Sequence, residues 1–249
     1  MRIKKTVDSI DYEKTSSFFK KRAEKYKNDN PYSVTMYQDN NPELVKKRNS
    51  EETQKIIPKL QLEDTSRILD VACGVGRWSD AINIEIEEYC GIDFCDGLIQ
   101  IAKERNSDLK NRFFFVGDIK NVTEVIDNNH NNSKYNRVLL IGALMYLNDS
   151  DLVSALESVE KLCEANTIIC IREPVGIGER LTLKEELSEE LCDEYNAIYR
   201  TRDELVTFFE ESLLKKGFTI QEEGFLFEDA KLNNRKETAQ YYFILGRTS

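Results

Sequence analysis

Apolar residues in the N-terminal part of the chain recur at helical spacing. Residues 8–27 carry a broken apolar stripe that predicts a helix, formed by Ile10, Phe18, Phe19, Ala23 and Tyr26. A second helix is predicted over residues 41–57, because this segment begins with a capping asparagine, a proline and an early glutamate. The aromatic segment 32–38 between them shows no strand alternation.

From residue 67 onward the pattern changes to short apolar segments that alternate with amphipathic ones. The apolar segments predict strands at residues 67–71, 89–93, 112–116, 137–142 and 167–173. The intervening segments predict helices at residues 77–82, 96–105 and 150–163. This alternation is typical of an α/β fold, and we expect a doubly wound, Rossmann-like and mostly parallel sheet.

The last third of the chain departs from that repeat. Residues 178–193 are an insertion rich in Glu and Leu. After it, a capping box at Thr201 and Glu204 predicts the start of a helix that ends near Gly217. Two final strands, at residues 218–227 and 239–246, predict an antiparallel C-terminal hairpin at the sheet edge. We expect one domain over residues 1–249, in which an N-terminal helical lid (1–60) covers a cofactor-binding core (61–249).

Composition narrows the classes of partner. The net charge is −10, from 45 acidic and 35 basic residues, and no basic run could follow a phosphate backbone, so we expect neither nucleic acid nor an anionic membrane as partner. The six cysteines form no CxxC pair, so we expect reduced thiols. The single histidine, His130, lies in a polar run, so we expect it to be exposed and expect no metal site.

The N-terminus lacks the apolar core of a signal peptide, and no segment approaches the roughly 20 apolar residues of a membrane-spanning helix. We therefore expect a cytoplasmic protein, either a monomer or a homodimer.

The candidate chemistry begins where the first predicted strand of the sheet ends. Small residues from Ala72 to Gly76 follow the strand, and a helix follows them, so a ligand can approach the backbone and reach free amide groups. Nucleotides bind at this position in open α/β sheets. Asp93 ends the next strand, 19 residues after Gly74, and is placed to accept hydrogen bonds from both ribose hydroxyls.

The spacing of the glycines argues against a dinucleotide cofactor. The third position of a GxGxxG motif is Ser79 here. A carboxylate at Asp70 would repel a pyrophosphate, whereas it can hold the cationic amino group of a methionine moiety. The site therefore suits a sulfonium nucleoside better than NAD, and an NAD-linked oxidoreductase is disfavoured.

At these residues the chain resembles the class I S-adenosylmethionine-dependent methyltransferases. The acidic-x-Gly-x-Gly-x-Gly motif of that family reads Asp70, Ala72, Gly74 and Gly76, with alanine where glycine is usual. The resemblance implies S-adenosyl-L-methionine as cofactor. It places Asp93 on the ribose, Phe94 beside the adenine, and the Asp118 carboxylate and Ile119 amide on the adenine edge. The implied cofactor contacts are Asp70, Ala72, Cys73, Gly74, Gly76, Trp78, Asp93, Phe94, Asp118, Ile119 and Ile141.

Several of these residues also have an ordinary structural interpretation. Trp78, the only tryptophan, is equally suited to anchor the core. Asp118 follows a glycine, a pair that is common in turns. Cys73 is most simply a packing residue.

Acceptor residues are expected in the segments that reach the carboxyl edge of the sheet. Methyl transfer depends mainly on alignment, with a general base as a smaller aid. We assign candidate catalytic roles to Glu173, Tyr37 and Tyr199, and candidate substrate-binding roles to Gln38, Arg48, Tyr146 and Arg200.

Residues 35–39 and 197–201 are similar to small bacterial methyltransferases of surface-polysaccharide and modified-sugar gene clusters. That resemblance implies a small acceptor of capsule polysaccharide biosynthesis, namely a sugar, a nucleotide-sugar or another phosphorylated metabolite, methylated on oxygen or nitrogen. Two alternatives stay open: a methyltransferase that acts on nucleic acid or protein, and a non-catalytic S-adenosylmethionine-binding regulatory module.

Overall fold

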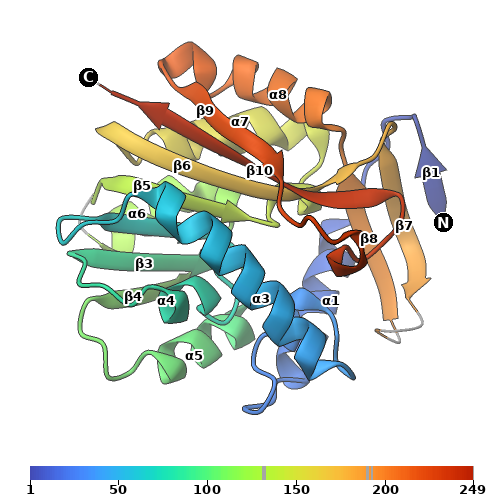
Figure 1. Ribbon diagram of the computed structural model, residues 1–249, viewed down its shortest axis with the longest axis horizontal. Helices are drawn as coiled ribbons and strands as arrows, with labels where there is room; N and C mark the ends of the chain where they lie inside the picture. The colour runs from blue at the N-terminus through green and yellow to red at the C-terminus, as the bar shows by residue number, and fades with distance from the viewer. Residues whose placement is uncertain (131–132, 189–190, 192, 249) are drawn as a thin grey trace.

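The computed structural model describes residues 1–130, 133–188, 191 and 193–248. A seven-stranded sheet lies at its centre, as Figure 1 shows in outline. The strand order is β4-β3-β2-β5-β6-β10-β9. Five strands run parallel: β2 (Arg67–Val71), β3 (Glu88–Asp93), β4 (Arg112–Val116), β5 (Tyr135–Ile141) and β6 (Cys163–Gly176). This arrangement confirms the doubly wound, mostly parallel sheet that the sequence predicts.

The C-terminal hairpin is also confirmed, with one difference in its position. It consists of β9 (Thr219–Phe225) and β10 (Thr238–Arg247), and β10 pairs antiparallel with both β6 and β9. Only β9 therefore lies at the edge of the sheet. β10 is an inner strand, which explains why its residues from Tyr242 to Leu245 are buried.

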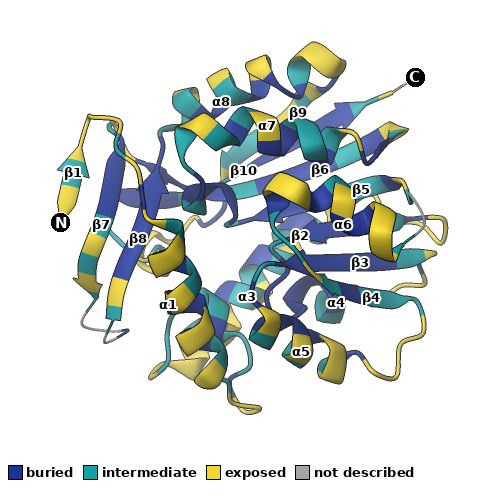
Figure 2. Cartoon of the chain, turned by 180° about the vertical axis from the view of Figure 1, so that it is seen from behind, coloured by how far each residue is buried: buried dark blue, intermediate teal, exposed yellow. Residues whose placement is uncertain are grey.

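Helices cover both faces of the sheet (Figures 1 and 2). One face carries α3 (Pro42–Ile56), η1 (Ile57–Leu60), α4 (Arg77–Ala81) and α5 (Asp96–Arg105), whose apolar residues share one core cluster with the strands. The other face carries η2 (Ile119–Asn121), α6 (Val122–Asn129), α7 (Asp149–Glu160), α8 (Arg202–Glu211) and η4 (Leu214–Lys216). Figure 2 shows buried strands between helices whose outer sides are exposed, which is the pattern of amphipathic helices on a sheet.

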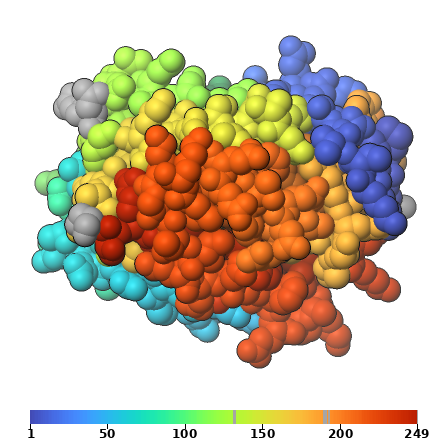
Figure 3. Space-filling view, turned by 90° about the horizontal axis from the view of Figure 1, so that it is seen from above, coloured from blue at the N-terminus to red at the C-terminus, as the bar shows by residue number. Residues whose placement is uncertain are grey.

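A second, three-stranded antiparallel sheet lies beside the first. Its order is β1-β7-β8, formed by β1 (Arg2–Lys4), β7 (Leu181–Ser188) and β8 (Asp193–Tyr199). The sequence predicted no strands in these segments, and residues 1–60, expected to form a helical lid, also contain β1. α1 (Tyr12–Glu24) packs its phenylalanines against this sheet in a third core cluster. Figure 3 shows the N-terminal residues, in blue, at one end of the molecule beside the orange C-terminal part.

The helix ends follow the signals read from the sequence. The side chain of Asn41 accepts a hydrogen bond from the Leu44 amide at the start of α3, and Thr201 forms a complete capping box with Glu204 at the start of α8. The aromatic segment 32–38 contains a short helix, α2 (Ser33–Met36), that ends at Tyr37 with φ 53°. Two further 3₁₀ turns are η3 (Leu144–Tyr146) and η5 (Ala230–Leu232).

The expectation that His130 is an exposed loop residue is wrong. It ends α6, and its ring is half-buried with its centroid 4.6 Å from that of Phe113 and its Nε2 2.9 Å from a Glu88 carboxylate oxygen. The five cysteines within the described residues are free and buried, while Cys192 lies outside them. No helix in the described part of the chain is long and apolar enough to cross a membrane.

Candidate functional site

A cavity of about 360 Å³ opens at the carboxyl ends of β2, β3, β5 and β6. Its floor is the strand ends and the loops that follow them, and its walls come from α1, α2, α3, β8 and the link between β9 and β10. Its volume is in the range of small-molecule sites in proteins. The cavity therefore lies where the sheet topology predicts a nucleotide-type ligand.

The loop after β2 forms the part of the cavity closest to the sheet. Gly74 and Gly76 have positive φ angles of 56° and 78°, which glycine adopts at little cost. Ala72, at φ 65°, takes the same left-handed conformation with a side chain present. The amides of Ala72 and Cys73 both donate to the carbonyl of Ile92, at 2.7 and 3.0 Å. The loop is thus fixed to β3, and the cofactor residues expected from Ala72 to Gly74 line the cavity.

Asp93 connects this loop to the end of β3. Its carboxylate accepts hydrogen bonds from the amides of Gly74 at 3.0 Å and Cys95 at 2.9 Å. The side chain lines the cavity but is only 5% exposed, and burial raises its pKa to about 6. A carboxylate held in this way has lone pairs available for ribose hydroxyls.

Asp70 does not line the cavity itself, but it directly precedes Val71, which does. The hydroxyl of Tyr89 donates to its Oδ2, while its Oδ1 is buried without a hydrogen-bond partner among the described residues. Burial raises its pKa to about 7, against the opposing effects of the Tyr89 hydrogen bond and the nearby Arg77. A buried acceptor that lacks a donor fits a ligand with a cationic amino group nearby.

The adenine side of the candidate site is formed by the ends of β3 and β4. Phe94, Asp118 and Ile119 line the cavity. Asp118 also caps η2 by accepting from the Lys120 amide at 2.9 Å, so it has a structural role as well. Ile141, at the end of β5, lines the same cavity, whereas Gly76 does not. Together with the loop, Asp93 and Asp70, these residues fit S-adenosylmethionine.

Four tyrosines form the wall opposite the cofactor loop: Tyr37, Tyr146, Tyr195 and Tyr199, here called the tyrosine cluster. The hydroxyl of Tyr146 is hydrogen-bonded to that of Tyr37 and, at 2.7 Å, to that of Tyr195. Burial raises the pKa of Tyr37 to about 12 and raises that of Tyr195 well above its usual value. These phenols remain protonated at neutral pH and act as hydrogen-bond donors.

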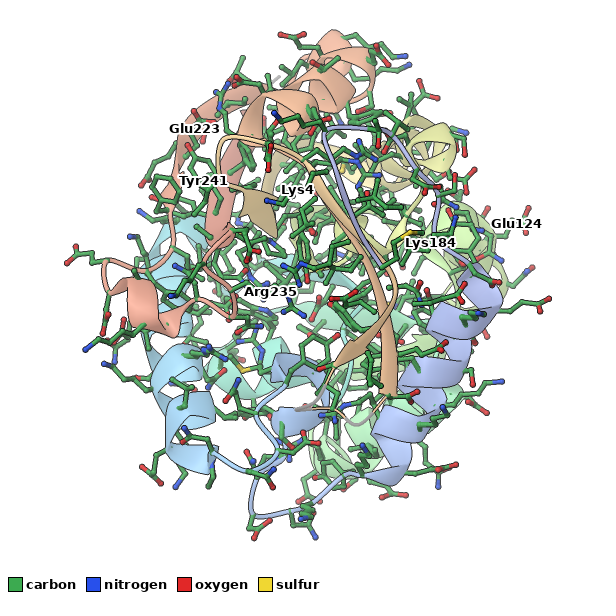
Figure 4. All side chains as sticks on the ribbon, turned by 90° about the vertical axis from the view of Figure 1, so that its right-hand side faces the viewer. Lys4, Glu124, Lys184, Glu223, Arg235 and Tyr241 are labelled. Atoms are coloured by element: carbon green, nitrogen blue, oxygen red, sulfur yellow. The ribbon has the colours of Figure 1, made fainter. Side chains whose placement is uncertain are left out.

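Sequence reasoning missed Tyr195. On β8, Tyr195 and Tyr199 are four positions apart, so they lie on the same face of the strand. The strand spacing of these two tyrosines would have indicated Tyr195 if the segment had been recognised as a strand. Arg235 packs against two of these rings from outside the cavity lining, with its guanidinium carbon 5.6 Å from the Tyr195 ring centroid and 5.9 Å from that of Tyr199. Figure 4 shows Arg235 in the link between β9 and β10.

The structure places three of the expected acceptor residues away from the cavity lining: Gln38, Glu173 and Arg200. The Glu173 carboxylate accepts from the amides of Ala143 and Leu144 at 2.8 Å and Met145 at 3.1 Å. Burial raises its pKa to about 7, which these hydrogen bonds oppose. Glu173 therefore holds the turn that follows β5.

Arg200 holds the same turn from the other side. Its guanidinium donates to the carbonyls of Leu144 and Leu147 at 2.9 and 2.7 Å and pairs with Asp149 at 2.6 Å. Arg48 does line the cavity, and its Nε donates to the Leu232 carbonyl at 2.7 Å. Trp78 also lines it, with an indole N–H that has no hydrogen-bond partner among the described residues.

No group of three or more His, Cys, Asp or Glu residues that could hold a metal ion occurs in the ranges that the structure describes.

Comparisons with known proteins agree with this site. A sequence model described as a methyltransferase domain matches residues 62–230. Two curated relatives are the phosphoethanolamine N-methyltransferase of Plasmodium falciparum, 30% identical over 113 residues, and phosphoethanolamine N-methyltransferase 1 of Triticum aestivum, 26% identical over 130 residues. These alignments cover 45% and 52% of this chain, and only 38% and 25% of the relatives.

Two solved structures share the fold. Phosphoethanolamine N-methyltransferase 1 of Haemonchus contortus, in complex with phosphoethanolamine and S-adenosylhomocysteine, superposes with a TM-score of 0.73 at 15% identity, over 95% of this chain and 49% of that chain. The N-methyltransferase NodS of Bradyrhizobium japonicum, in complex with S-adenosylhomocysteine, gives a TM-score of 0.61 at 14% identity, over 95% and 100% of the two chains. At these identities the likeness concerns the fold.

Proposed function

The chain belongs to the methyltransferase domain family, and from that premise we propose that it transfers the methyl group of S-adenosyl-L-methionine to a small phosphorylated acceptor. The observation that carries the proposal is the position of the tyrosine cluster, a wall of hydroxyl groups that faces the same cavity as the loop after β2. One cavity thus has a cofactor wall and an acceptor wall.

The residues of the cofactor wall bind the cofactor and orient it. When bound, S-adenosyl-L-methionine supplies a methyl group that its cationic sulfur already activates. Asp93 accepts from the ribose hydroxyls, and the strand-end residues from Asp118 to Ile119 hold the adenine. Phe19, Thr35 and Tyr37 of the N-terminal segment line the cavity from above, so they exclude water and fix the acceptor against the methyl group. Such alignment is worth on the order of 7–11 kcal/mol.

The acceptor wall favours an anion. Phenol hydroxyls donate hydrogen bonds to phosphate oxygens, and the tyrosine cluster places several of them on one side of the cavity. The two curated relatives that are named for phosphoethanolamine support a phosphorylated acceptor. A sugar or nucleotide-sugar of capsule polysaccharide biosynthesis, implied by residues 35–39 and 197–201, is the second acceptor class to be tested.

The geometry also favours a nitrogen acceptor over an oxygen acceptor. An oxygen acceptor must lose a proton, but burial raises the pKa of the Tyr37 hydroxyl to about 12 and that of Tyr199 in the same direction. The Glu173 carboxylate is engaged by three amides. An uncharged amine needs no base from the protein, so we place the amine of a small phosphorylated compound at the methyl group.

Calorimetric titration with S-adenosylmethionine and S-adenosylhomocysteine, with NAD as control, tests the cofactor. Mass spectrometry with labelled S-adenosylmethionine then tests phosphoethanolamine, other phosphorylated amines and nucleotide-sugars as acceptors. We expect binding of the sulfur nucleosides alone and methylation of a phosphorylated amine. Binding without any methylated product would favour the non-catalytic regulatory module, and preference for NAD would contradict the cofactor assignment.

A matched pair of variants tests the acceptor wall. Tyr195→Phe removes one hydroxyl of the tyrosine cluster, whereas Tyr241→Phe removes one from β10 outside the cavity. We expect Tyr195→Phe to raise the acceptor KM by about 5- to 10-fold, the effect of one lost hydrogen bond, and to leave the Kd of S-adenosylhomocysteine unchanged. An equal KM in the two variants would remove the hydroxyl from acceptor binding.

A further inference from the structure

A buried group of charges forms a third wall of the cavity, beneath α3. Glu52 of α3 is 1% exposed, and its two carboxylate oxygens pair with the Nη1 atom of Arg77 at 2.9 Å and the Nε atom of Arg172 at 2.6 Å. Arg77 also donates to Asn49 at 2.9 Å, and Arg172 donates to Gln240 at 3.1 Å. Glu52, Arg77 and Arg172 all line the cavity, and we call the two arginines the arginine pair.

This wall has more positive than negative charge. Burial would raise the pKa of Glu52, but Arg172 and Arg77 hold it below its ordinary value, so Glu52 is a carboxylate. One carboxylate thus faces the two guanidinium groups of the arginine pair. Cationic side chains in a buried position are costly unless an anion or further hydrogen-bond acceptors balance them. The excess charge indicates that this wall receives an anionic group.

The arginine pair lies next to the cofactor loop. Arg77 is the first residue of α4 and follows Gly76 directly. Arg172 ends beside the turn after β5, where a Cβ added to Gly142 would lie 3.2 Å from its Nη1 atom. Trp78, adjacent to Arg77, contributes the buried indole N–H that has no partner among the described residues. Guanidinium and indole donors therefore meet the part of the cavity between the loop after β2 and the end of β5.

The arginine pair and the tyrosine cluster lie in different parts of the structure. The tyrosines pack with α1 and β8 in one core cluster, whereas Trp78 packs with α3 and α4 in another. A ligand seated on the loop after β2 can therefore direct one anionic group toward the arginines while its other end faces the tyrosines.

We propose that the arginine pair, held in place by Glu52, binds the carboxylate of the amino acid portion of S-adenosylmethionine. This inference rests on the proposed function, because it assigns one end of the proposed cofactor. A guanidinium group suits this role, since its planar donors match the two oxygens of a carboxylate. With Asp70 near the ammonium group, the zwitterionic end of the cofactor meets charges of both signs. An acidic acceptor is the other possible source of a carboxylate at this wall.

Two ligands that differ only in the carboxylate separate these sources. S-adenosylmethionine and its decarboxylated analogue share the nucleoside, the sulfonium and the ammonium group. Their Kd values are measured by calorimetry without acceptor, for the wild type and for Arg172→Met. We expect the wild type to prefer S-adenosylmethionine by about 10- to 100-fold, the usual effect of a charge-assisted hydrogen bond, and Arg172→Met to lose most of that preference.

Three variants guard against a purely structural effect. Arg137→Met removes a half-buried arginine from the opposite end of β5, where it donates to the carbonyls of Leu60 and Gln61, and we expect it to keep the wild-type preference. Glu52→Gln removes the competing carboxylate and should keep or increase the preference. If Arg172→Met does not fold, Arg172→Lys retains the charge without the planar donors, and we expect it to have an intermediate preference.

Several outcomes would overturn the inference. Equal affinity of the wild type for the two ligands would show that the carboxylate is not bound. An equal loss for both ligands in Arg172→Met would assign the arginine a structural role. An unchanged cofactor preference with a raised acceptor KM would assign it to an acidic acceptor. If the wild type bound neither ligand, the proposed function itself would fail, and this inference with it.

Discussion

Thr35 of α2 lies directly over Gly74 of the loop after β2, and a Cβ added to Gly74 would come within 2.7 Å of the Thr35 methyl carbon. Gly74 also has φ 56° and donates its amide to Asp93. We predict that Gly74→Ala lowers the free energy of unfolding by about 1–2 kcal/mol from the left-handed backbone alone, and weakens S-adenosylhomocysteine binding. Urea unfolding and calorimetry measure the two effects.

A second variant separates the clash from the backbone cost. Thr35→Ser removes the methyl carbon that an alanine at position 74 would meet, and the Thr35 Cβ lies farther away, at 3.8 Å. The double variant should recover part of the affinity lost in Gly74→Ala but not the backbone part. If Thr35→Ser gave no recovery, the contact between α2 and the loop would not limit binding.

Ala72 gives the opposite prediction. It has φ 65°, a conformation that costs an alanine roughly 1–2 kcal/mol and a glycine almost nothing. Part of that gain is lost to the greater freedom of glycine in the unfolded chain. We predict that Ala72→Gly raises the free energy of unfolding by about 0.5–1 kcal/mol and preserves S-adenosylhomocysteine binding, because the loop keeps its hydrogen bonds to Ile92.

The matched control for Ala72→Gly is the same substitution within a helix. Ala102 lies in α5, where glycine costs about 1 kcal/mol relative to alanine, so Ala102→Gly should destabilise the protein. If both substitutions destabilised the protein, the conformation of Ala72 would have to be reconsidered.

The sequence predicted those elements whose signals are local. The strand 112–116 and the helix 96–105 match the structure residue for residue, because apolar runs and polar boundaries define both. The helix α6 was missed although its signal was present, since Val122, Val125 and Ile126 lie at helical spacing and are buried. Because α6 follows η2 directly, the sequence shows no clear boundary at which the helix begins.

Non-local contacts account for the elements that the sequence could not predict. β1 has three residues and pairs with β7, about 180 positions away, so neither segment carries a complete pattern by itself. β7 is further interrupted by a register shift between Leu183 and Glu186, with Glu185 at φ 50°. This irregularity breaks the alternation that would reveal a strand.

The same reasoning explains the candidate site. The loop from Asp70 to Gly76 was visible because its residues are contiguous. The contact of Glu52 with Arg77 and Arg172 joins three segments of the chain, and no local pattern in the sequence indicates it. Arg200 and Glu173 were expected at the acceptor, yet their side chains bind the turn after β5.

The affinity for S-adenosylhomocysteine should depend on pH. Burial raises the pKa of Asp70 to about 7 and that of Asp93 to about 6 in the unliganded protein. The ammonium group and the ribose hydroxyls of the ligand both favour the ionised carboxylates, so binding lowers these pKa values. Affinity is therefore highest above pH 7 and falls as the pH drops through 7 and then 6, by up to about tenfold per pH unit for each group.

Calorimetry between about pH 5.5 and 7.5, in two buffers of different ionisation enthalpy, measures both the affinity and the released protons. Asp93→Asn should remove the part of the dependence near pH 6 and retain the part near pH 7. Affinity that stayed constant across this range, without proton release, would show that neither carboxylate interacts with the bound ligand.

Arg200 provides a test that separates a structural role from substrate binding. It is 2% exposed, pairs with Asp149, and donates to the carbonyls of Leu144 and Leu147. Its removal leaves the carbonyls of Leu144 and Leu147 without this donor, which costs about 1–3 kcal/mol for each buried group, while Asp149 keeps its ion pair with Arg180. We predict a loss of this size in the free energy of unfolding for Arg200→Met, measured with urea.

The stability losses from replacing Arg200 and from replacing its partner Asp149 should not simply add. Arg180 pairs with Asp149 as well, at 2.8 Å. When Arg200→Met is combined with Asp149→Asn, Arg180 keeps only its ion pair with Glu204, at 3.4 Å, among its two carboxylate partners. We expect the two losses to be less than additive, because both substitutions act on one network. A variant Arg200→Met that kept its stability but showed a raised acceptor KM would instead return Arg200 to the acceptor site.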